Sequence, residues 1–251
     1  MNRSYRPFCV LALTLTGLLA TASTVRDAAQ AQTRTTPRAN ESVQRLLYVA
    51  SPGIRDYLEY GGHGILVFDI DDDHKFVRRI SLDGHGVDER GKPINVKGVC
   101  ANAETHRFYV STKRHLICLD LLTDEVLWQR EFSLGCDRMS ISPDGSTIYQ
   151  PSFEEDRWYV LDAHDGSIIT EIVPDSRAHN TVYAVDGMEA YLAGLSSPLL
   201  TVTDAKTHEV SRTIGPFGGS IRPFTVNGDR SLVFVNVNGL LGFEIGDLKT
   251  G

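Results

Sequence analysis

The sequence has few cysteines, and their spacing does not form a disulfide framework. Four occur in 251 residues, and Cys9 lies in an N-terminal apolar run that is typical of an export signal. Three remain beyond it, an odd number, so at least one is free or pairs outside the chain. Cys100 and Cys118 fall on the first and third strands of one repeat, which are not neighbours, and Cys136 begins the next. Export permits disulfides, but we expect none to organise the fold.

Several signatures of catalytic and cofactor sites are also missing. The chain has no phosphate-binding glycine loop, no G-x-S-x-G elbow, no C-x-x-C-H haem site and no basic patch with interleaved aromatics. The formal net charge of −7 argues against nucleic acid as the main partner. No histidine pair has ligand spacing, and the acidic segment 69–74 lacks the glycine and glutamate of a calcium-binding EF-hand loop. We predict no cofactor and no metal ion.

Long apolar runs are absent after the N-terminus. There, a basic head precedes an apolar run over residues 8–22, and small-residue cleavage sites follow. This pattern predicts a signal peptide and cleavage region over residues 1–31, and therefore a periplasmic or secreted protein. An uncleaved membrane anchor is the alternative, although the run is short for a bilayer. Residues 32–44 are rich in Thr, Arg, Gln, Asn and Pro, which predicts a flexible leader.

The dominant feature that is present is a repeat of about 40–45 residues. Each copy has a strand with an aromatic residue, the last four spaced 40, 42 and 43 residues apart: Tyr48, Tyr109, Tyr149, Tyr191 and Phe234. A second apolar strand then runs into an aspartate, the last four spaced 42, 42 and 43 apart: Asp69, Asp120, Asp162, Asp204 and Asp247. This period, with several short strands per copy, indicates β-propeller blades. We predict one all-β domain over residues 45–251, built from four-stranded blades.

Five blades are predicted. They cover approximately residues 45–82, 96–134, 136–174, 178–215 and 220–251. The third is the clearest, with an inner strand over 138–142, a Pro-Asp-Gly turn, and strands over 147–150, 157–161 and 168–172. The first lacks a convincing inner strand and the last lacks an outer one. Because a propeller usually closes its ring with strands from both termini, we expect about two further blades in a seven-bladed ring. An open or oligomer-closed ring is the alternative.

The repeat also resembles a known family. The cassettes Ser-Pro-Asp-Gly-Ser-Thr-Ile-Tyr at 142–149 and Val-Leu-Asp-Ala-His-Asp-Gly-Ser-Ile-Ile at 160–169 resemble the YVTN family of β-propeller repeats. The same pattern recurs at 108–111 and 202–207, and the resemblance covers essentially all of residues 45–251. It implies a seven-bladed ring of the group that includes quinoprotein amine dehydrogenase heavy chains and exported proteins of the YncE type. That group also includes lactonases and surface-layer binding modules, so the resemblance implies a fold more than a function.

One segment resembles a cofactor-associated repeat. Residues 119–128 are similar to the D-x-x-T-G-x-x-x-W docking repeat of pyrroloquinoline-quinone dehydrogenases. The version with its tryptophan occurs only once, and Asp124 replaces the usual glycine. One copy does not support a bound quinone.

Polar residues recur where the inner strands begin, the end of the channel at which propeller ligands usually bind. Aligning the blades places six of them at or beside equivalent positions: Lys97, Asp137, Arg138, His179, Asn180 and Arg222. The functional interpretation is an anion-friendly pocket at the channel mouth. The alternative is the polar, watery mouth that propellers have in any case.

Blade one departs most from the period, because its aromatic lies 61 residues before the next. The surplus falls in two loops, 51–63 and 83–93, which should emerge on the channel-mouth face. Long loops on a rigid scaffold concentrate binding residues. The predicted ligand-binding residues of the loops and ring together are Arg55, Tyr57, Tyr60, His63, His85, Lys97, Arg138, His179 and Arg222. The loop carboxylates Asp88 and Glu89 could join the histidines in general-base catalysis.

The favoured function is an exported, non-catalytic binding or scaffold module whose channel-mouth face takes a protein partner or a small polar or anionic ligand. The alternative is a propeller enzyme or enzyme subunit, similar to a lactonase or to a periplasmic quinoprotein dehydrogenase heavy chain. The two hypotheses differ in whether these side chains should converge on one point. An enzyme needs a base and an electrophilic stabiliser within reach of one substrate position.

Overall fold

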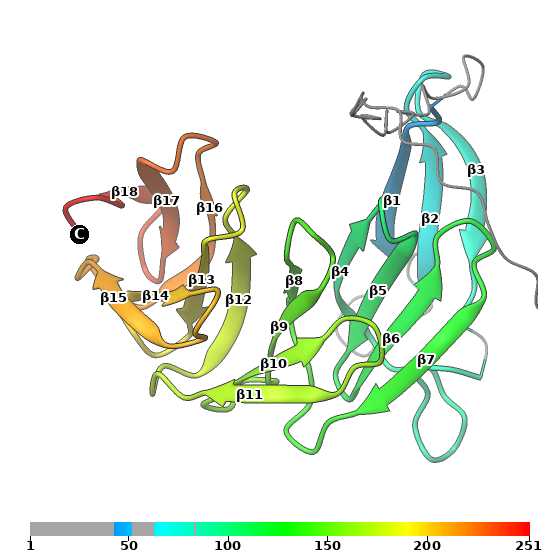
Figure 1. Cartoon of the computed structure of the whole chain (residues 1–251), viewed down its shortest axis with the longest axis horizontal. Helices are drawn as coiled ribbons and strands as arrows, with labels where there is room; N and C mark the ends of the chain where they lie inside the picture. The colour runs from blue at the N-terminus through cyan, green and yellow to red at the C-terminus, as the bar shows by residue number, and fades with distance from the viewer. Residues whose placement is uncertain (1–42, 52–62, 83) are drawn as a thin grey trace, which may run out of the picture. The chain divides into compact units, whose positions relative to one another are not determined.

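The computed structural model describes residues 43–51, 63–82 and 84–251. These residues contain 18 β-strands in five antiparallel sheets (Figure 1), all within the compact unit Gln44–Gly251. Each sheet is one blade, so the fold is an all-β, five-bladed β-propeller with three or four strands per blade. Within the described ranges, no helix is long and apolar enough to cross a membrane.

The strands follow the predicted repeat. Blade one contains β1 (Leu46–Ser51), β2 (Gly64–Asp69) and β3 (Lys75–Ile80). Blade two contains β4 (Val96–Asn102), β5 (Arg107–Thr112), β6 (His115–Asp120) and β7 (Val126–Glu131). Blade three contains β8 (Ser140–Ile141), β9 (Thr147–Pro151), β10 (Trp158–Asp162) and β11 (Ile168–Ile172). Blade four contains β12 (Ala178–Tyr183), β13 (Glu189–Gly194), β14 (Leu200–Asp204) and β15 (Val210–Ile214). Blade five contains β16 (Ile221–Val226), β17 (Leu232–Val237) and β18 (Phe243–Asp247).

Each blade is a meander in which consecutive strands pair. In blade two, Tyr109 on β5 pairs with Cys100 on β4 and with Cys118 on β6. The two thiols therefore lie two strands apart, and they and Cys136 are free, as the spacing predicted. The inner strand of blade three is shorter than predicted, because Arg138 leaves the sheet and forms a parallel bridge with Asn180 of the next blade.

The repeated aspartate ends the third strand and caps the turn into the fourth. In blade two, Asp120 Oδ1 accepts the backbone N–H groups of Leu122 at 2.8 Å and Thr123 at 2.9 Å. Asp204 and Asp247 make the same pair of bonds in blades four and five. Such bonds stabilise the charged carboxylate, so they lower the pKa of all three side chains. The regular spacing of these aspartates in the sequence thus reflects the same capped turn after the third strand of each of these blades.

The repeated aromatic holds consecutive blades together. Tyr109, Tyr149 and Tyr191 are fully buried, each in the apolar core between its own blade and the next. The Tyr109 hydroxyl donates to Ala163 O at 2.9 Å, in the aspartate-capped turn of blade three. The Tyr149 hydroxyl lies 2.8 Å from His208 Nδ1 in the corresponding turn of blade four. The repeated aromatic of one blade therefore contacts the aspartate-capped turn of the next blade.

Four apolar cores join blade one to two, two to three, three to four and four to five. Among the described residues, no such core joins blade five to blade one. Within the described residues, blades one and five have three strands each, and by alignment with the other blades the inner strand of blade one and the outer strand of blade five are the ones not seen there.

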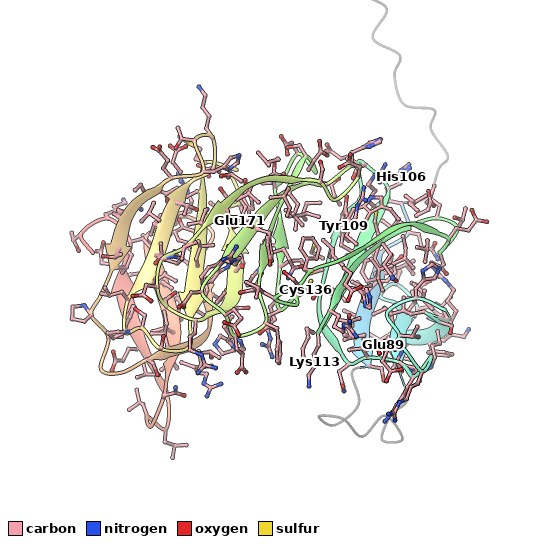
Figure 2. The ribbon with its side chains drawn as sticks, turned by 90° about the horizontal axis from the view of Figure 1, so that it is seen from below. Glu89, His106, Tyr109, Lys113, Cys136 and Glu171 are labelled. Atoms are coloured by element: carbon pink, nitrogen blue, oxygen red, sulfur yellow. The ribbon has the colours of Figure 1, made fainter. Side chains whose placement is uncertain are left out.

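The loops fall on two faces. Figure 2 shows Lys113 and Glu89 at one edge of blade two and His106 at the opposite edge, with Tyr109 between them. Lys113 follows the second strand, Glu89 precedes the first, and His106 lies in the turn between the first and second strands. The face of Lys113 and Glu89 is the predicted channel-mouth face.

Candidate functional site at the channel mouth

Five side chains from blades two, three and four form a mouth cluster: Lys97, Asp137, Arg138, Phe153 and His179. Lys97 lies on β4, Asp137 and Arg138 lead into β8, Phe153 follows β9, and His179 is on β12. Gly98 permits the close approach of β4 and β8, because a Cβ atom there would lie 3.0 Å from Arg138 Cα. The cluster thus depends on inner strands that pack tightly around the channel.

Asp137 is the buried centre of the cluster, 1% exposed. Its carbonyl oxygen accepts from Ser111 Oγ at 2.7 Å and from Gln150 Nε2 at 3.1 Å. Its backbone N–H donates to Pro151 O at 2.9 Å. Because side chains of blades two and three both hold this one residue, its carboxylate has a fixed position.

The Asp137 carboxylate binds one histidine and one arginine. Oδ2 lies 2.9 Å from His179 Nδ1, and Oδ1 lies 3.1 Å from Arg138 Nη1. The same Nη1 is 3.1 Å from His179 Nε2 and 3.3 Å from Nδ1. With Nδ1 donating to the carboxylate, Nε2 is the acceptor and faces the guanidinium. Both ring nitrogens therefore have a polar partner within the cluster.

Lys97 is the least satisfied member of the cluster. Its Nζ lies 4.9 Å from the centre of the Phe153 ring, and Nζ of Lys113 lies 5.4 Å from the same ring. Burial lowers the pKa of Lys97. The charge of Asp137 opposes this, those of Lys113 and Arg138 lower the pKa further, and that of Glu154 raises it slightly. No acceptor in the described part of the chain lies within hydrogen-bonding distance of this ammonium.

A glycine brings the two loops of this site together. Gly135 has φ +69°, and a Cβ atom there would lie 2.3 Å from Lys113 O and 2.8 Å from Phe153 Cβ. Phe153 N donates to the neighbouring Leu134 O at 2.8 Å, and Cys136 N to Lys113 O at 3.3 Å. Beside these loops lies a hollow of about 360 Å³ with Lys113, Leu134 and Phe153 in its lining.

The structure brings together three of the predicted ligand-binding residues, Lys97, Arg138 and His179. His63 lies elsewhere, with Nε2 2.8 Å from Ile94 O. Arg222 is exposed, and its Nε donates to Asn238 Oδ1 at 2.7 Å. His85 is half-buried in the loop before β4, and its backbone N–H donates to Leu82 O. The predicted residues Arg55, Tyr57 and Tyr60 lie outside the described residues.

The loop carboxylates do not join the histidine in the described contacts. Asp88 Oδ1 accepts from the backbone N–H groups of Arg90 at 2.9 Å and Lys92 at 2.8 Å, so it shapes its own turn. Glu89 is exposed and lies 3.9 Å from Arg114. Across the described ranges, no group of three or more His, Cys, Asp and Glu side chains could hold a metal ion.

Phe153 and Gly135 were not selected from the sequence. The available signal was an aromatic residue immediately before the charged segment 154–157, in a loop on the channel-mouth face. Gly135 had a weaker signal, because a glycine between two blades is ordinary turn chemistry.

Comparison with protein-family models finds no match, and comparison with curated proteins also finds none. Solved structures show the fold. The β-propeller domain of Cps50 (Swd1) from Myceliophteria thermophila is similar with a TM-score of 0.57 and 12% identity, over 78% of this chain and 65% of that one. Kuenenia stuttgartiensis hydrazine synthase is similar with a TM-score of 0.58 and 14% identity, over 70% of this chain and 49% of that one. The chain therefore spans less than two thirds of either structure's length.

Proposed function

We propose that this protein is an exported, non-catalytic binding module whose mouth cluster captures an anionic group of a small ligand or partner protein. The observation that carries the proposal is the Lys97 ammonium. It is half-buried, lies against Phe153, and lacks a hydrogen-bond acceptor among the described residues. A carboxylate or phosphate would supply that acceptor and offset the repulsion from Arg138.

The expected contribution of this contact follows from its type. Hydrogen bonds to charged groups contribute about 1.5–3 kcal/mol, and about 1.4 kcal/mol corresponds to tenfold in affinity. Cation–π contact with Phe153 holds the ammonium in place but leaves its N–H donors available. Loss of the Lys97 charge should therefore weaken anion binding about tenfold or more.

The arrangement around His179 favours binding over catalysis. Its Nδ1 faces Asp137 and its Nε2 faces Arg138, so neither nitrogen serves as a base in this geometry. The buried His–Asp pair is the one observation that favours the enzymatic alternative, because such a pair orients a general base once its other nitrogen is released. Hydrolysis of a lactone probe that His179→Gln abolishes would favour the enzyme.

The proposal also includes location, family and ring size. The basic head and apolar run at the N-terminus support export to the periplasm or the exterior. The cassettes over 142–149 and 160–169 support membership of the YVTN-type repeat family. Propellers typically have about 4–8 blades, and both similar solved structures are longer than this chain, which supports a ring of about seven. One of those structures is an enzyme by name, so the fold alone does not choose between the functions.

Calorimetric titration of the full chain with citrate, inorganic phosphate and acetate tests the proposal. We expect saturable binding of at least one of these anions and about tenfold or greater loss in Lys97→Met. The control is Lys206→Met, an exposed lysine in the turn after β14, which should bind as the parent does. Equal binding by both variants, or no binding of any of the three anions, would refute capture at the mouth cluster.

A further inference from the structure

Blade five presents an uncovered apolar face. We call Phe234, Asn236, Phe243 and Ile245 its tail face; their side chains share one side of the sheet, because Phe234 pairs with Ile245 and Asn236 with Phe243. Phe243 is 58% exposed and Ile245 56%. A hollow of about 320 Å³ opens on this face, and Phe224, Phe234 and Phe243 help to line it.

The tail face of blade five matches the face that blade four buries. Each position lies 43 residues after its counterpart in blade four: Tyr191, Ala193, Leu200 and Val202. All four counterparts are fully buried, and they pack in the core against blade five. The corresponding residues of blade two, Tyr109, Ser111, Leu116 and Cys118, are fully buried as well. In blades two and four the next blade thus covers these positions, whereas in blade five Phe243 and Ile245 at the same positions are exposed.

The faces that cover these positions also repeat. Blade five covers blade four with its head face, which includes Val233 and Val235. Blade two covers blade one with Phe108 and Val110 at the same positions of its second strand. In all four cores the covering face thus consists of apolar second-strand side chains, with Ile148 of blade three and Ala190 and Leu192 of blade four at these positions.

We infer that the tail face of blade five is a docking surface for a further propeller blade. That blade would contact it through its head face, as blade five contacts blade four. Asn236 gives the partner a polar requirement. It occupies the position of Ser111, whose hydroxyl donates to Asp137 O of the following blade at 2.7 Å. The incoming blade therefore offers an apolar second strand and a backbone carbonyl beside it.

A second copy of the chain is the competing occupant. The head face of blade one includes Leu47 and Val49, which are 40% and 37% exposed. Its contact with the tail face of another copy would be heterologous, forming a ring with twice five blades or an open filament. Because propellers typically have about 4–8 blades, the structure favours a further blade. This inference rests on the proposed larger ring but not on any ligand at the mouth.

The test extends the chain with its own repeat. Asp247 corresponds to Asp204, so Gly251 corresponds to His208, and residues 209–251 appended after Gly251 continue the period. The appended β15 sequence then supplies a fourth strand for blade five, and the appended β16–β18 sequence supplies the next blade. Asn236→Cys in the original blade five only introduces an exposed thiol into the tail face.

We expect the thiol at position 236 to react with a maleimide about tenfold or more slowly in the extended protein than in the unextended one, because docking protects it. A thiol introduced by Lys206→Cys should react equally in both. Val235→Asp in the appended copy should restore fast labelling.

A second variant guards against a poor fit of the copied blade. Phe234→Tyr, Phe243→Leu and Ile245→Val give the original blade five the tail face of blade four, which already accepts the copied head face. Slow labelling in this variant alone overturns the inference for the native face, and fast labelling in both overturns it altogether. Sedimentation of the unextended chain supplies the last outcome: concentration-dependent association that Val49→Asp abolishes would assign the face to a second copy.

Discussion

Replacing Gly135 with alanine tests how the mouth site is built. At φ +69° an alanine costs about 1–2 kcal/mol, because its Cβ meets the adjacent carbonyl oxygen in the left-handed region. The new Cβ would also lie 2.3 Å from Lys113 O, a backbone atom that a rotamer change cannot move. Forced displacement of packed atoms typically costs about 1–3 kcal/mol. We therefore expect Gly135→Ala to lower the free energy of unfolding by about 2–5 kcal/mol.

Gly239→Ala separates the two contributions. Gly239 has φ +83°, and a Cβ atom there would meet nothing within 4 Å. Only the conformational cost of about 1–2 kcal/mol applies. Urea unfolding of both variants, with an unchanged slope as the condition for comparison, measures the difference. Equal losses would show that the Lys113 and Phe153 loops are not held together at Gly135, and citrate titration should show weaker binding in Gly135→Ala alone.

Three further predictions concern the repeat and the N-terminus. The lowered pKa of Asp204 means that folding stabilises its charged form, so this stability is present above the unfolded pKa of about 3.9 and is lost as pH falls through the folded pKa. Asp204→Asn should therefore make the unfolding free energy fall less steeply with decreasing pH in the acid range. An unchanged acid dependence would contradict this. Tyr109→Phe should destabilise the fold by about 1–3 kcal/mol, because Ala163 O loses its buried donor, whereas Tyr183→Phe, whose hydroxyl has no hydrogen bond in the described part, should lose less in the same denaturant titration. Mass spectrometry of the exported protein should find an N-terminus near Ser23 or Gln32, and an intact Met1 would rule out cleavage.

The all-β repeat was predictable because its recurring features depend on local chemistry. The aspartate at the end of each third strand caps a turn through its own neighbours in sequence, as Asp120 does with Leu122 and Thr123. The second-strand aromatic belongs to an alternating pattern of inward and outward side chains that is typical of β-strands. Both features repeat at a fixed spacing, so the sequence alone predicted an all-β propeller, and the structure has five blades of three or four strands.

The short inner strand of blade three was not predictable from the same pattern. Residues 138–142 alternate as a strand should, yet only Ser140–Ile141 pair with β9. The competing interaction is long-range in sequence: Arg138 bridges to Asn180 and contacts His179, both in the next blade. A tertiary contact therefore overrides local strand propensity at the position where the channel-mouth cluster forms.

The position of Lys97 shows why the repeat spacing predicts which residues lie at the channel mouth but not which of their side chains contact one another. A repeat tells which residues occupy equivalent positions within blades, whereas Lys97, Lys113 and Phe153 meet only because loops of different blades converge at Gly135. Their convergence opposes stability, since burial and neighbouring cations lower the pKa of Lys97 and so disfavour its charged form. The aromatic ring and the carboxylates of Asp137 and Glu154 offset this only in part. An anion from outside would stabilise a half-buried ammonium that lies beside another cation, and this is the physical basis for the ligand capture proposed for the mouth cluster.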